Sequence, residues 1–399
     1  MSCDTSDVAA WLIDGARSAG RPEDVLGELC ARLTACGIPL WRGAVFVRTL
    51  HPEVTGRRFL WRRGAEVTIG ELPYERLETD EFRASPVVHV YGTAAPLRRR
   101  LRDAAEAADF EVLRDLRAEG ATDYLASPLL FTDGSIQVAT WATDHADGFS
   151  DEHIAGIEAV MAPFARIAEI RALRRTASSL LDTYVGHHSG EQILAGRIRR
   201  GHTESIRAAI WLSDMRGFTA LANRLSPEAL IGVLNRYFDC QVPAVLDRGG
   251  EVLKFIGDGL LAIFPVDADR DDFRACEAAL TAADQARADV AALNASAGAD
   301  CVEILRFGVA LHVGEVLYGN VGGGNRLDFT CIGPAVNLAA RIETLTGKLG
   351  RTVLTSSEFA QHCAPRLASI GEFLLPGSES EQPVFGLVDE APRPAQQPA

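Results

Sequence analysis

Two hydrophobic periodicities alternate along the first 170 residues, and each indicates its own kind of element. Spacings of three and four predict helices, and short apolar runs predict strands. The predicted order is a helix over Val8–Ser18, a helix over Pro22–Cys36, a strand over Gly43–Val47, a loop-rich stretch containing FLWRRG, a charged helix around Leu97–Glu119, and strands over Tyr124–Phe131 and Ser135–Ala142 joined by Thr132-Asp133-Gly134. A helix follows from about Ser150, so the pattern predicts an α+β module.

The closing helix continues as a linker. Its apolar residues step by three and four, with one register shift between Ile167 and Ile170. This pattern favours a short parallel coiled coil with a stammer. An amphipathic helix packed on its own domain is the alternative. Gly186 ends the pattern, and a small unit, Ser189–Arg200, precedes the next domain.

A second pattern begins at about Glu204. The predicted elements are a buried strand over Ala208–Ser213, a helix from Ser226-Pro227-Glu228 to Gly249, strands over Glu251–Ile256 and Leu260–Phe264 around a Gly257-Asp258-Gly259 hairpin, a helix over Asp271–Ala292, a strand over Ile304–His312, a helix over Pro334–Leu345 and a strand over Thr352–Thr355. This order predicts an α+β sandwich of the ferredoxin-like type. We expect domains at residues 1–172 and 204–390, a linker at 173–203 and a disordered tail at 391–399.

Composition excludes several classes of function. Forty basic and fifty-four acidic side chains give a formal net charge of −14, which disfavours nucleic acid and anionic membranes as partners. No apolar run approaches a spanning helix, and the first residues lack the features of a secretory signal. The eight cysteines form no C-x2-C pair, so we expect neither zinc nor a disulfide framework, and a cytoplasmic location. Cys30 and Cys36 are interpreted as buried thiols, with a redox pair as the alternative.

Two aspartates are the first candidates for chemistry. Asp214 follows a buried strand, and Asp258 lies between glycines in the hairpin. Carboxylates on a strand end and a neighbouring hairpin can converge on Mg²⁺, which proteins bind through one or two carboxylates together with substrate phosphates. The turn at Gly217 precedes a helix whose backbone N–H groups can meet a phosphate. Taken singly, Asp258 is better explained as a turn former and Asp214 as a helix cap.

Three motifs in order change that balance: IWLSDMRGFT, GGEVLKFIGDGLLAIF and LDFTCIGPAVNLAARIE. Together they resemble a class III nucleotide cyclase catalytic domain, over roughly residues 204–387. The order of elements before the linker resembles, more weakly, a divergent GAF sensor domain.

The cyclase resemblance implies a role for each matching residue. Asp214, Asp258 and the Met215 carbonyl match metal ligands, Lys254 and Thr330 match the residues that recognise the purine, and Asn337 and Arg341 match the residues that stabilise the transition state. Arg216, Gly217, Phe218 and Thr219 are expected to bind substrate. The resemblance also implies two Mg²⁺ or Mn²⁺ ions per site and a head-to-tail homodimer with sites at its interface.

Base choice follows from the hydrogen-bond inventory. Lys254 only donates, which suits adenine N1, and the Thr330 hydroxyl accepts from N6. Asp328, two residues earlier, would take that role if the register differed. The lysine–threonine pair resembles a subgroup some of whose members respond to bicarbonate. Pro376 stands where relatives often carry a lysine or arginine that binds the triphosphate, and proline has no donor to offer.

We therefore predict an adenylate cyclase that makes cyclic AMP and pyrophosphate from ATP, regulated through its N-terminal domain by an unidentified small molecule or ion. A guanylate or dual-specificity cyclase is the first alternative. A catalytically silent module for dimerisation or nucleotide sensing is the second, supported by Pro376 alone.

Overall fold

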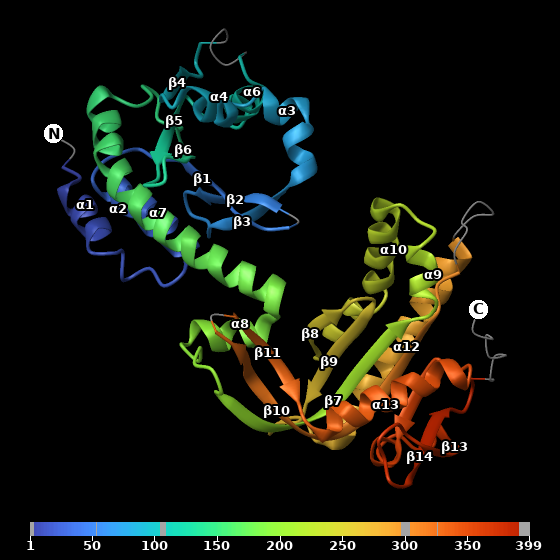
Figure 1. Cartoon of the computed structure of the whole chain (residues 1–399). Coiled ribbons are helices and arrows are strands. Elements are labelled where there is room, and N and C mark those ends of the chain that lie inside the picture. The colour runs from blue at the N-terminus through green and yellow to red at the C-terminus, as the bar shows by residue number, and fades with distance from the viewer. Residues whose placement is uncertain (1–3, 53, 104–108, 297–303, 325, 391–399) are drawn as a thin grey trace. The chain divides into compact units, whose positions relative to one another are not determined.

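A computed structural model of the chain describes residues 4–52, 54–103, 109–296, 304–324 and 326–390. The chain divides into two compact units, Met1–Leu180 and Leu181–Ala399, which we describe separately (Figure 1). The division falls inside one long helix. The expected tail at residues 391–399 lies outside the described residues, and the expected domain limits stay predictions.

The N-terminal unit is a six-stranded antiparallel sheet between helices. Its elements are α1 (Ser6–Ile13), α2 (Pro22–Ala35), β1 (Arg42–Arg48), β2 (Val54–Arg62), β3 (Thr68–Pro73), a 3₁₀ turn (Tyr74–Glu78), α3 (Asp80–Arg83), α4 (Pro86–Thr93), β4 (Leu97–Arg100), α6 (Glu111–Ala118), β5 (Asp123–Leu130), β6 (Ile136–Thr143) and α7 (Asp151–Val185). The strands follow the order β3-β2-β1-β6-β5-β4.

Each face of this sheet has its own core. One face packs against α1, α2 and α7 around Trp141, Leu29 and Ile157. The other packs against α4 and α6 around Tyr124 and Val90. The unit therefore has three layers, and α7 is part of the outer one on the first face (Figure 1).

Two sequence predictions in this unit are wrong. FLWRRG was expected in a loop, but its first four residues complete β2, which pairs with β1 from Gly56 to Arg62. The charged segment Leu97–Glu119 was expected to be one helix, but it begins as the edge strand β4, paired with β5. Both strands are fixed by pairing with distant neighbours, which overrides their weak local pattern.

Helix α7 is 35 residues long and changes character along its length. Its buried residues begin at Gly156 and end at Glu169. Beyond that point its side chains are exposed or half-buried, and the helix ends before Gly186, whose φ is +86°. A short helix, α8 (His187–Leu194), follows directly.

The C-terminal unit is built on an eight-stranded sheet. Its elements are α8, β7 (Thr203–Met215), α9 (Phe218–Ala222), α10 (Pro227–Asp239), α11 (Val242–Leu246), β8 (Glu251–Ile256), β9 (Gly259–Pro265), α12 (Asp272–Ser296), β10 (Phe307–Gly323), β11 (Arg326–Ile332), α13 (Pro334–Lys348), β12 (Val353–Ser356), α14 (Ser357–Ala360), β13 (Leu367–Leu374) and β14 (Glu381–Leu387). Its order is β13-β14-β12-β10-β7-β9-β8, and β11 pairs with β10.

Strands β10-β7-β9-β8 have the antiparallel order 4-1-3-2 of a ferredoxin-like fold, so the predicted α+β class is confirmed. Helices α10, α11 and α12 contribute to the core on one face, around Trp211 and Phe264. Helix α13 packs on the other face, around Ile210 and Ile342. Within the described residues, no helix is long and apolar enough to cross a membrane.

Candidate functional site

The end of β7 carries Asp214 and is held by a buried polar network. The Trp211 indole donates to the Ser213 hydroxyl at 3.1 Å, and that hydroxyl donates to Gln241 Oε1 at 2.6 Å. Ser213 lies opposite Leu260 and Val309, on the face of α12. Because side chains alternate along a strand, Asp214 points to the other face, toward α13.

The β8–β9 hairpin brings Asp258 to the same place. Ile256 pairs with Gly259, leaving Gly257 and Asp258 as a two-residue turn. Gly257 has a φ of +64°, which favours glycine. A Cβ on Gly259 would lie 2.9 Å from the Ser213 carbonyl oxygen and 3.4 Å from Asp214 Oδ1, so only glycine lets the hairpin approach β7 this closely.

The Asp214 carboxyl group is perturbed by its surroundings. Burial raises the pKa of Asp214 to about 6, and the charges of Asp258 and Glu343 add to that effect. The Arg216 guanidinium acts in the opposite direction. Full ionisation of Asp214 therefore costs free energy unless a further positive charge enters the site.

Arg216 is occupied by a partner that sequence reasoning missed. Its Nη2 donates to Glu343 Oε1 of α13 at 2.9 Å, and Glu343 is buried. Gly308 lies beneath this contact, because a Cβ there would collide with Arg216 and Thr346. The two residues are 127 positions apart in the chain, so no local sequence pattern predicts their contact. The other residues expected to bind substrate follow directly: Gly217 has a φ of +76°, and Phe218 and Thr219 begin α9.

Lys254 is aimed by an irregularity in β8. The register of β8 against β9 shifts between Val252 and Lys254, which places Lys254 opposite Leu261. Leu261 belongs to the core on the α13 face, so the bulge turns Lys254 toward that face. There its Nζ makes an ion pair with Asp328 of β11.

Thr330, the other expected purine-recognising residue, lies two positions farther along β11. It pairs with Gly319 of β10 and is buried, with 5% of its surface exposed, whereas the Asp328 side chain is 61% exposed. In this structure Asp328, and not Thr330, is therefore the residue that contacts Lys254.

Helix α13 carries the two residues expected at the transition state. It begins at Pro334, after Gly333. Asn337 is exposed in its first turn, and Arg341 follows one turn later and is half-buried. Arg341 Nη1 donates to Ser378 Oγ at 3.3 Å, in the turn between β13 and β14 that also contains the exposed Pro376. That turn therefore positions Arg341, although Pro376 gives it no side-chain donor for the triphosphate.

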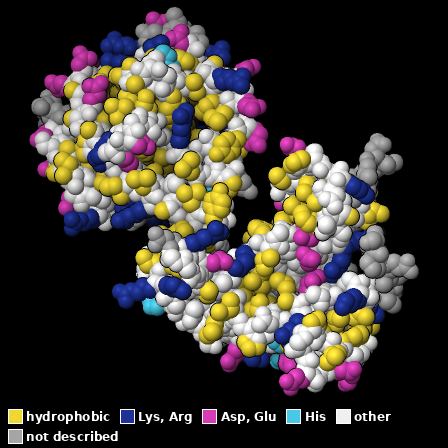
Figure 2. All heavy atoms as spheres, in the orientation of Figure 1, with side chains coloured by type: hydrophobic (Ala, Val, Ile, Leu, Met, Phe, Trp, Pro, Cys, Tyr) yellow, Lys and Arg dark blue, Asp and Glu magenta, His cyan; other side chains and the backbone are white. Residues whose placement is uncertain are grey.

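Apolar side chains lie exposed around these polar groups. Phe255 and Ile256 of β8 and Leu327 and Ile332 of β11 are between 38% and 53% exposed. Figure 2 shows hydrophobic side chains gathered on the face of this unit where β8 and β9 are seen in Figure 1, with acidic side chains beside them. We call these four residues the apolar rim.

A second buried network joins α8 to the base of β8. Glu251 is buried and accepts from the Tyr318 hydroxyl at 2.9 Å and from the Ser189 hydroxyl at 2.9 Å. His188 stacks on the Tyr318 ring, with centroids 5.8 Å apart. His187 is the first residue of α8 and contacts Asp182 and Glu191.

The donor set suits a hard divalent cation that also binds phosphate. Two carboxylates converge, and the backbone carbonyl of Met215 follows Asp214 directly. Within the described part of the chain, no group of three or more His, Cys, Asp or Glu side chains is arranged to hold a metal. A Mg²⁺ or Mn²⁺ site here would therefore need substrate oxygens to complete its coordination.

Fold and site together describe an α+β domain that presents paired carboxylates at a sheet edge, an arrangement suited to metal-assisted chemistry on phosphates. Residues 202–382 match the family model of the adenylate and guanylate cyclase catalytic domain. Adenylate cyclase 1 of Rhizobium meliloti (strain 1021) is 28% identical over 230 residues, 55% of this chain and 34% of that protein. The adenylate cyclase of Anabaena cylindrica is 32% identical over 168 residues, 41% of this chain and 32% of that protein.

Among solved structures, the adenylyl cyclase CyaB from P. aeruginosa is 25% identical, covers 49% of this chain and 100% of its own, and superposes with a TM-score of 0.41. The chain spans about a third of the length of the two curated relatives. Residues 202–382 are a class III adenylate/guanylate cyclase catalytic domain.

Proposed function

We propose that the protein is an adenylate cyclase that converts ATP to 3′,5′-cyclic AMP and pyrophosphate. The observation that carries this proposal is the convergence of Asp214 and Asp258 within a cyclase domain, where burial and mutual repulsion raise the pKa of Asp214 to about 6. Such a pair is poised to accept a divalent cation together with a polyphosphate.

In this proposal Asp214, Asp258 and the Met215 carbonyl hold two Mg²⁺ or Mn²⁺ ions. When bound, these ions would neutralise the triphosphate and favour loss of the 3′ proton. The reaction forms a bond between O3′ and the α-phosphorus, breaks the bond from that phosphorus to the β-bridging oxygen, and releases pyrophosphate. Class III cyclases in general depend on Mg²⁺ or Mn²⁺.

The remaining polar residues bind and orient the nucleotide. Arg341, held by Ser378, would meet the charge that grows on the α-phosphate, and Asn337 would hold the ribose. Arg216 is committed to Glu343, so we assign it to shaping the carboxylate site more than to the triphosphate. The turn of Gly217 and the residues Phe218 and Thr219 would line the phosphates.

Adenine recognition is assigned to Lys254 with a neighbouring acceptor on β11. Adenine presents an acceptor at N1 and a donor at N6, and Lys254 and a carboxylate or hydroxyl are complementary to both. Thr330 is the expected acceptor, and the ion pair of Asp328 with Lys254 makes Asp328 a second candidate. The two residues project from the same face of β11 because they are two apart.

A homodimer would complete the site. The apolar rim surrounds Lys254 and Asp328, and exposed apolar side chains of this kind favour burial against another protein surface. In a head-to-tail dimer, the carboxylates of one chain would face Lys254, Asn337 and Arg341 of its partner, giving two equivalent sites.

Guanylate or dual-specificity cyclisation is the alternative within the same family. Guanine reverses the pattern, with a donor at N1 and an acceptor at O6, so Lys254 favours adenine. A catalytically silent dimerisation or nucleotide-sensing module is supported only by Pro376. Regulation by the N-terminal unit, through a GAF-like sensor and the linker helix α7, belongs to the proposal, and bicarbonate is one possible regulator.

Product formation tests the proposal directly. The full chain is given ATP or GTP with Mn²⁺ and then Mg²⁺, alongside Asp258→Ala and a control, Asp239→Ala, which changes an exposed aspartate of α10. We expect cyclic AMP from ATP, lost in Asp258→Ala and retained in the control. Cyclic GMP as the main product would overturn the base assignment. If the protein is a folded dimer but forms no product from either nucleotide, the proposal of cyclase activity is wrong, and a catalytically silent dimerisation or nucleotide-sensing module is favoured.

A further inference from the structure

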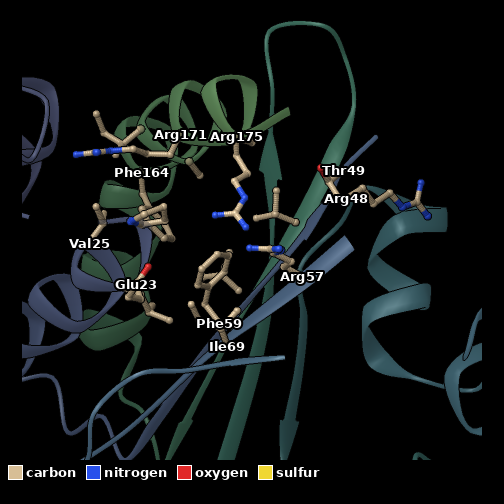
Figure 3. A pocket seen from close by; sticks show the side chains of 17 residues that line it. Glu23, Val25, Arg48, Thr49, Arg57, Phe59, Ile69, Phe164, Arg171 and Arg175 are labelled. Atoms are coloured by element: carbon tan, nitrogen blue, oxygen red, sulfur yellow. The ribbon is translucent and has the colours of Figure 1, made fainter. Parts of the chain in front are cut away.

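A pocket of about 140 Å³ opens in the N-terminal unit, between the β1–β3 end of the sheet and helices α2 and α7. Its floor is apolar and includes Val47, Phe59, Ile69, Phe164 and Ile167 (Figure 3). A cavity near 150 Å³ can hold a benzene-sized molecule. The floor therefore has room for a small ring or a short branched chain.

The rest of the lining is strongly cationic. Arg48, Arg57, Arg171 and Arg175 line the pocket, against a single acidic residue, Glu23. Arg48 lies over the Tyr91 ring, and Glu23 is 3.5 Å from Arg21. Arg171 donates to the Ala19 and Gly20 carbonyl oxygens at 2.8 and 2.9 Å, and its charge helps to lower the pKa of Asp24.

Arg57 and Arg175 are the two guanidinium groups that project over the floor. Figure 3 shows Arg175 extending from α7 toward Arg57, which comes from the sheet, with Phe59 beneath them. Arg57 donates to Glu71 at 2.7 Å. Arg175 has no hydrogen bond or ion pair among the described residues, and the site therefore has excess positive charge at its opening.

We propose that this pocket binds a small apolar carboxylate, with its hydrocarbon part on Phe59 and Phe164 and its carboxylate between Arg57 and Arg175. The floor accounts for the apolar part, since burial of apolar surface favours a hydrocarbon group over a bare inorganic anion. The arginines account for the charge, because a planar guanidinium matches a carboxylate.

The location of Arg175 gives this site a regulatory consequence. The buried part of α7 ends at Glu169, so Arg171, Ala172 and Arg175 lie where the helix leaves the core. Just after Arg175, the Thr176 hydroxyl is hydrogen-bonded to the Thr49 hydroxyl at 3.4 Å, which connects α7 to the loop that follows β1. A carboxylate shared by Arg57 and Arg175 would add a second tie, and α7 would be held to the sheet for about one more turn.

Direct binding to the full chain tests the site without nucleotide or metal, so a failure of the proposed catalysis does not affect the result. Benzoate, cyclohexanecarboxylate and isovalerate are titrated by calorimetry in 150 mM salt, with benzamide and inorganic phosphate as neutral and bare-anion comparisons. We expect at least one carboxylate to bind, and benzamide and phosphate to bind at least tenfold more weakly. Absence of binding by all three acids, or equal binding of benzamide, overturns the proposal.

Matched variants locate the binding. Arg175→Ala should weaken the carboxylate by about tenfold or more, and Arg175→Lys by less, because a point charge retains attraction without the planar match. Arg174→Ala, an exposed neighbour on the same helix, is the control and should bind as the wild type does. Ala172→Phe should block the pocket. Unchanged affinity in Arg175→Ala and Ala172→Phe, with unfolding curves that show both are folded, would falsify the site.

Hydrogen exchange supplies a readout of the regulatory step. Bound carboxylate should slow amide exchange across residues 170–180 of α7 in the wild type and in Arg174→Ala, and leave it unchanged in Arg175→Ala. Binding without protection of this segment would overturn the link to the helix.

Discussion

The two units share an architecture of one sheet between helices, but their candidate sites gather charges of opposite sign. Each is a sheet with helices on both faces, antiparallel throughout in the N-terminal unit and antiparallel except for the β10–β12 pair in the C-terminal unit. In the C-terminal unit, carboxylates converge at the end of β7, and the Arg216 guanidinium beside them is already paired with Glu343. In the N-terminal unit, four arginines and one acidic residue, Glu23, line a pocket with an apolar floor. The sign of the charges gathered in a site therefore indicates the class of ligand more specifically than the arrangement of sheet and helices does.

The largest expected effect is a loss of catalytic rate in the C-terminal unit. Arg341→Ala removes the cation that meets the growing charge on the α-phosphate, and we expect kcat to fall by about 10²–10³-fold with a smaller change in KM. Steady-state cyclic AMP formation measures this. Ser378→Ala, which removes only the partner of Arg341, should lower kcat by about tenfold or less. A higher KM with kcat unchanged in Arg341→Ala would instead assign Arg341 to uniform binding of the ground state and the transition state.

The next effect separates the two candidate acceptors on β11. If Asp328 accepts from adenine N6, Asp328→Asn should reduce the preference for ATP over GTP by roughly 10-fold, because the amide that replaces the carboxylate can also donate to guanine O6. If Thr330 is the acceptor, Thr330→Val should have that effect and Asp328→Asn should not. The ratio of kcat/KM for the two nucleotides is the measurement. Unchanged ratios in both variants would contradict any role for β11 in base choice.

A third prediction concerns stability in the C-terminal unit. Glu251→Gln weakens charge-assisted hydrogen bonds to Tyr318 and Ser189 in a buried setting, so we expect the free energy of unfolding to fall by about 1–3 kcal/mol. Urea unfolding at fixed protein concentration measures it. Glu191→Gln, an exposed glutamate of α8, is the control and should change stability by less than about 0.5 kcal/mol.

The smallest expected effect is a pH dependence of the metal-free protein. The pKa of Asp214 is about 6, above its unfolded value, so the folded state is favoured when this group is protonated. That contribution is complete below about pH 4 and is lost as the pH rises through 6. At pH 8 in EDTA, Asp214→Asn should therefore be more stable than wild type by roughly 1–2 kcal/mol, after allowance for solvent screening of this partly buried group.

Divalent metal should reverse that order. Mn²⁺ would stabilise the wild type and leave Asp214→Asn almost unchanged, because the variant lacks one carboxylate. Urea unfolding at pH 5 and pH 8, with EDTA and with Mn²⁺, measures both effects. Parallel pH profiles of the two proteins in EDTA would contradict a perturbed Asp214.

Sequence reasoning predicted the features that depend on local rules. The Gly257-Asp258 hairpin and the helix that starts at Pro334 both follow from glycine and proline at fixed positions. It did not find the bulge that aims Lys254, because a register shift depends on the partner strand. Nor did it find Glu343, whose contact with Arg216 depends on how α13 packs over β7.

The N-terminal pocket was harder to anticipate for the same physical reason. Its lining comes from residues between Pro22 and Arg175, and no two of its arginines stand in a motif. The edge strand β4 shows the same limit, because LRRR becomes a strand only through its pairing with β5.

Gly186 has a mechanical consequence for the C-terminal unit. A Cβ at this position would lie 3.1 Å from the Val252 carbonyl oxygen and 3.4 Å from Glu251 Oε1, so the junction between α7 and α8 lies close to the main chain of β8 and to the buried Glu251 side chain. Side chains can change rotamer and absorb a displacement, whereas main chains that lie close together have little such compliance. A small shift at the end of α7 would therefore be passed to the strand whose bulge aims Lys254.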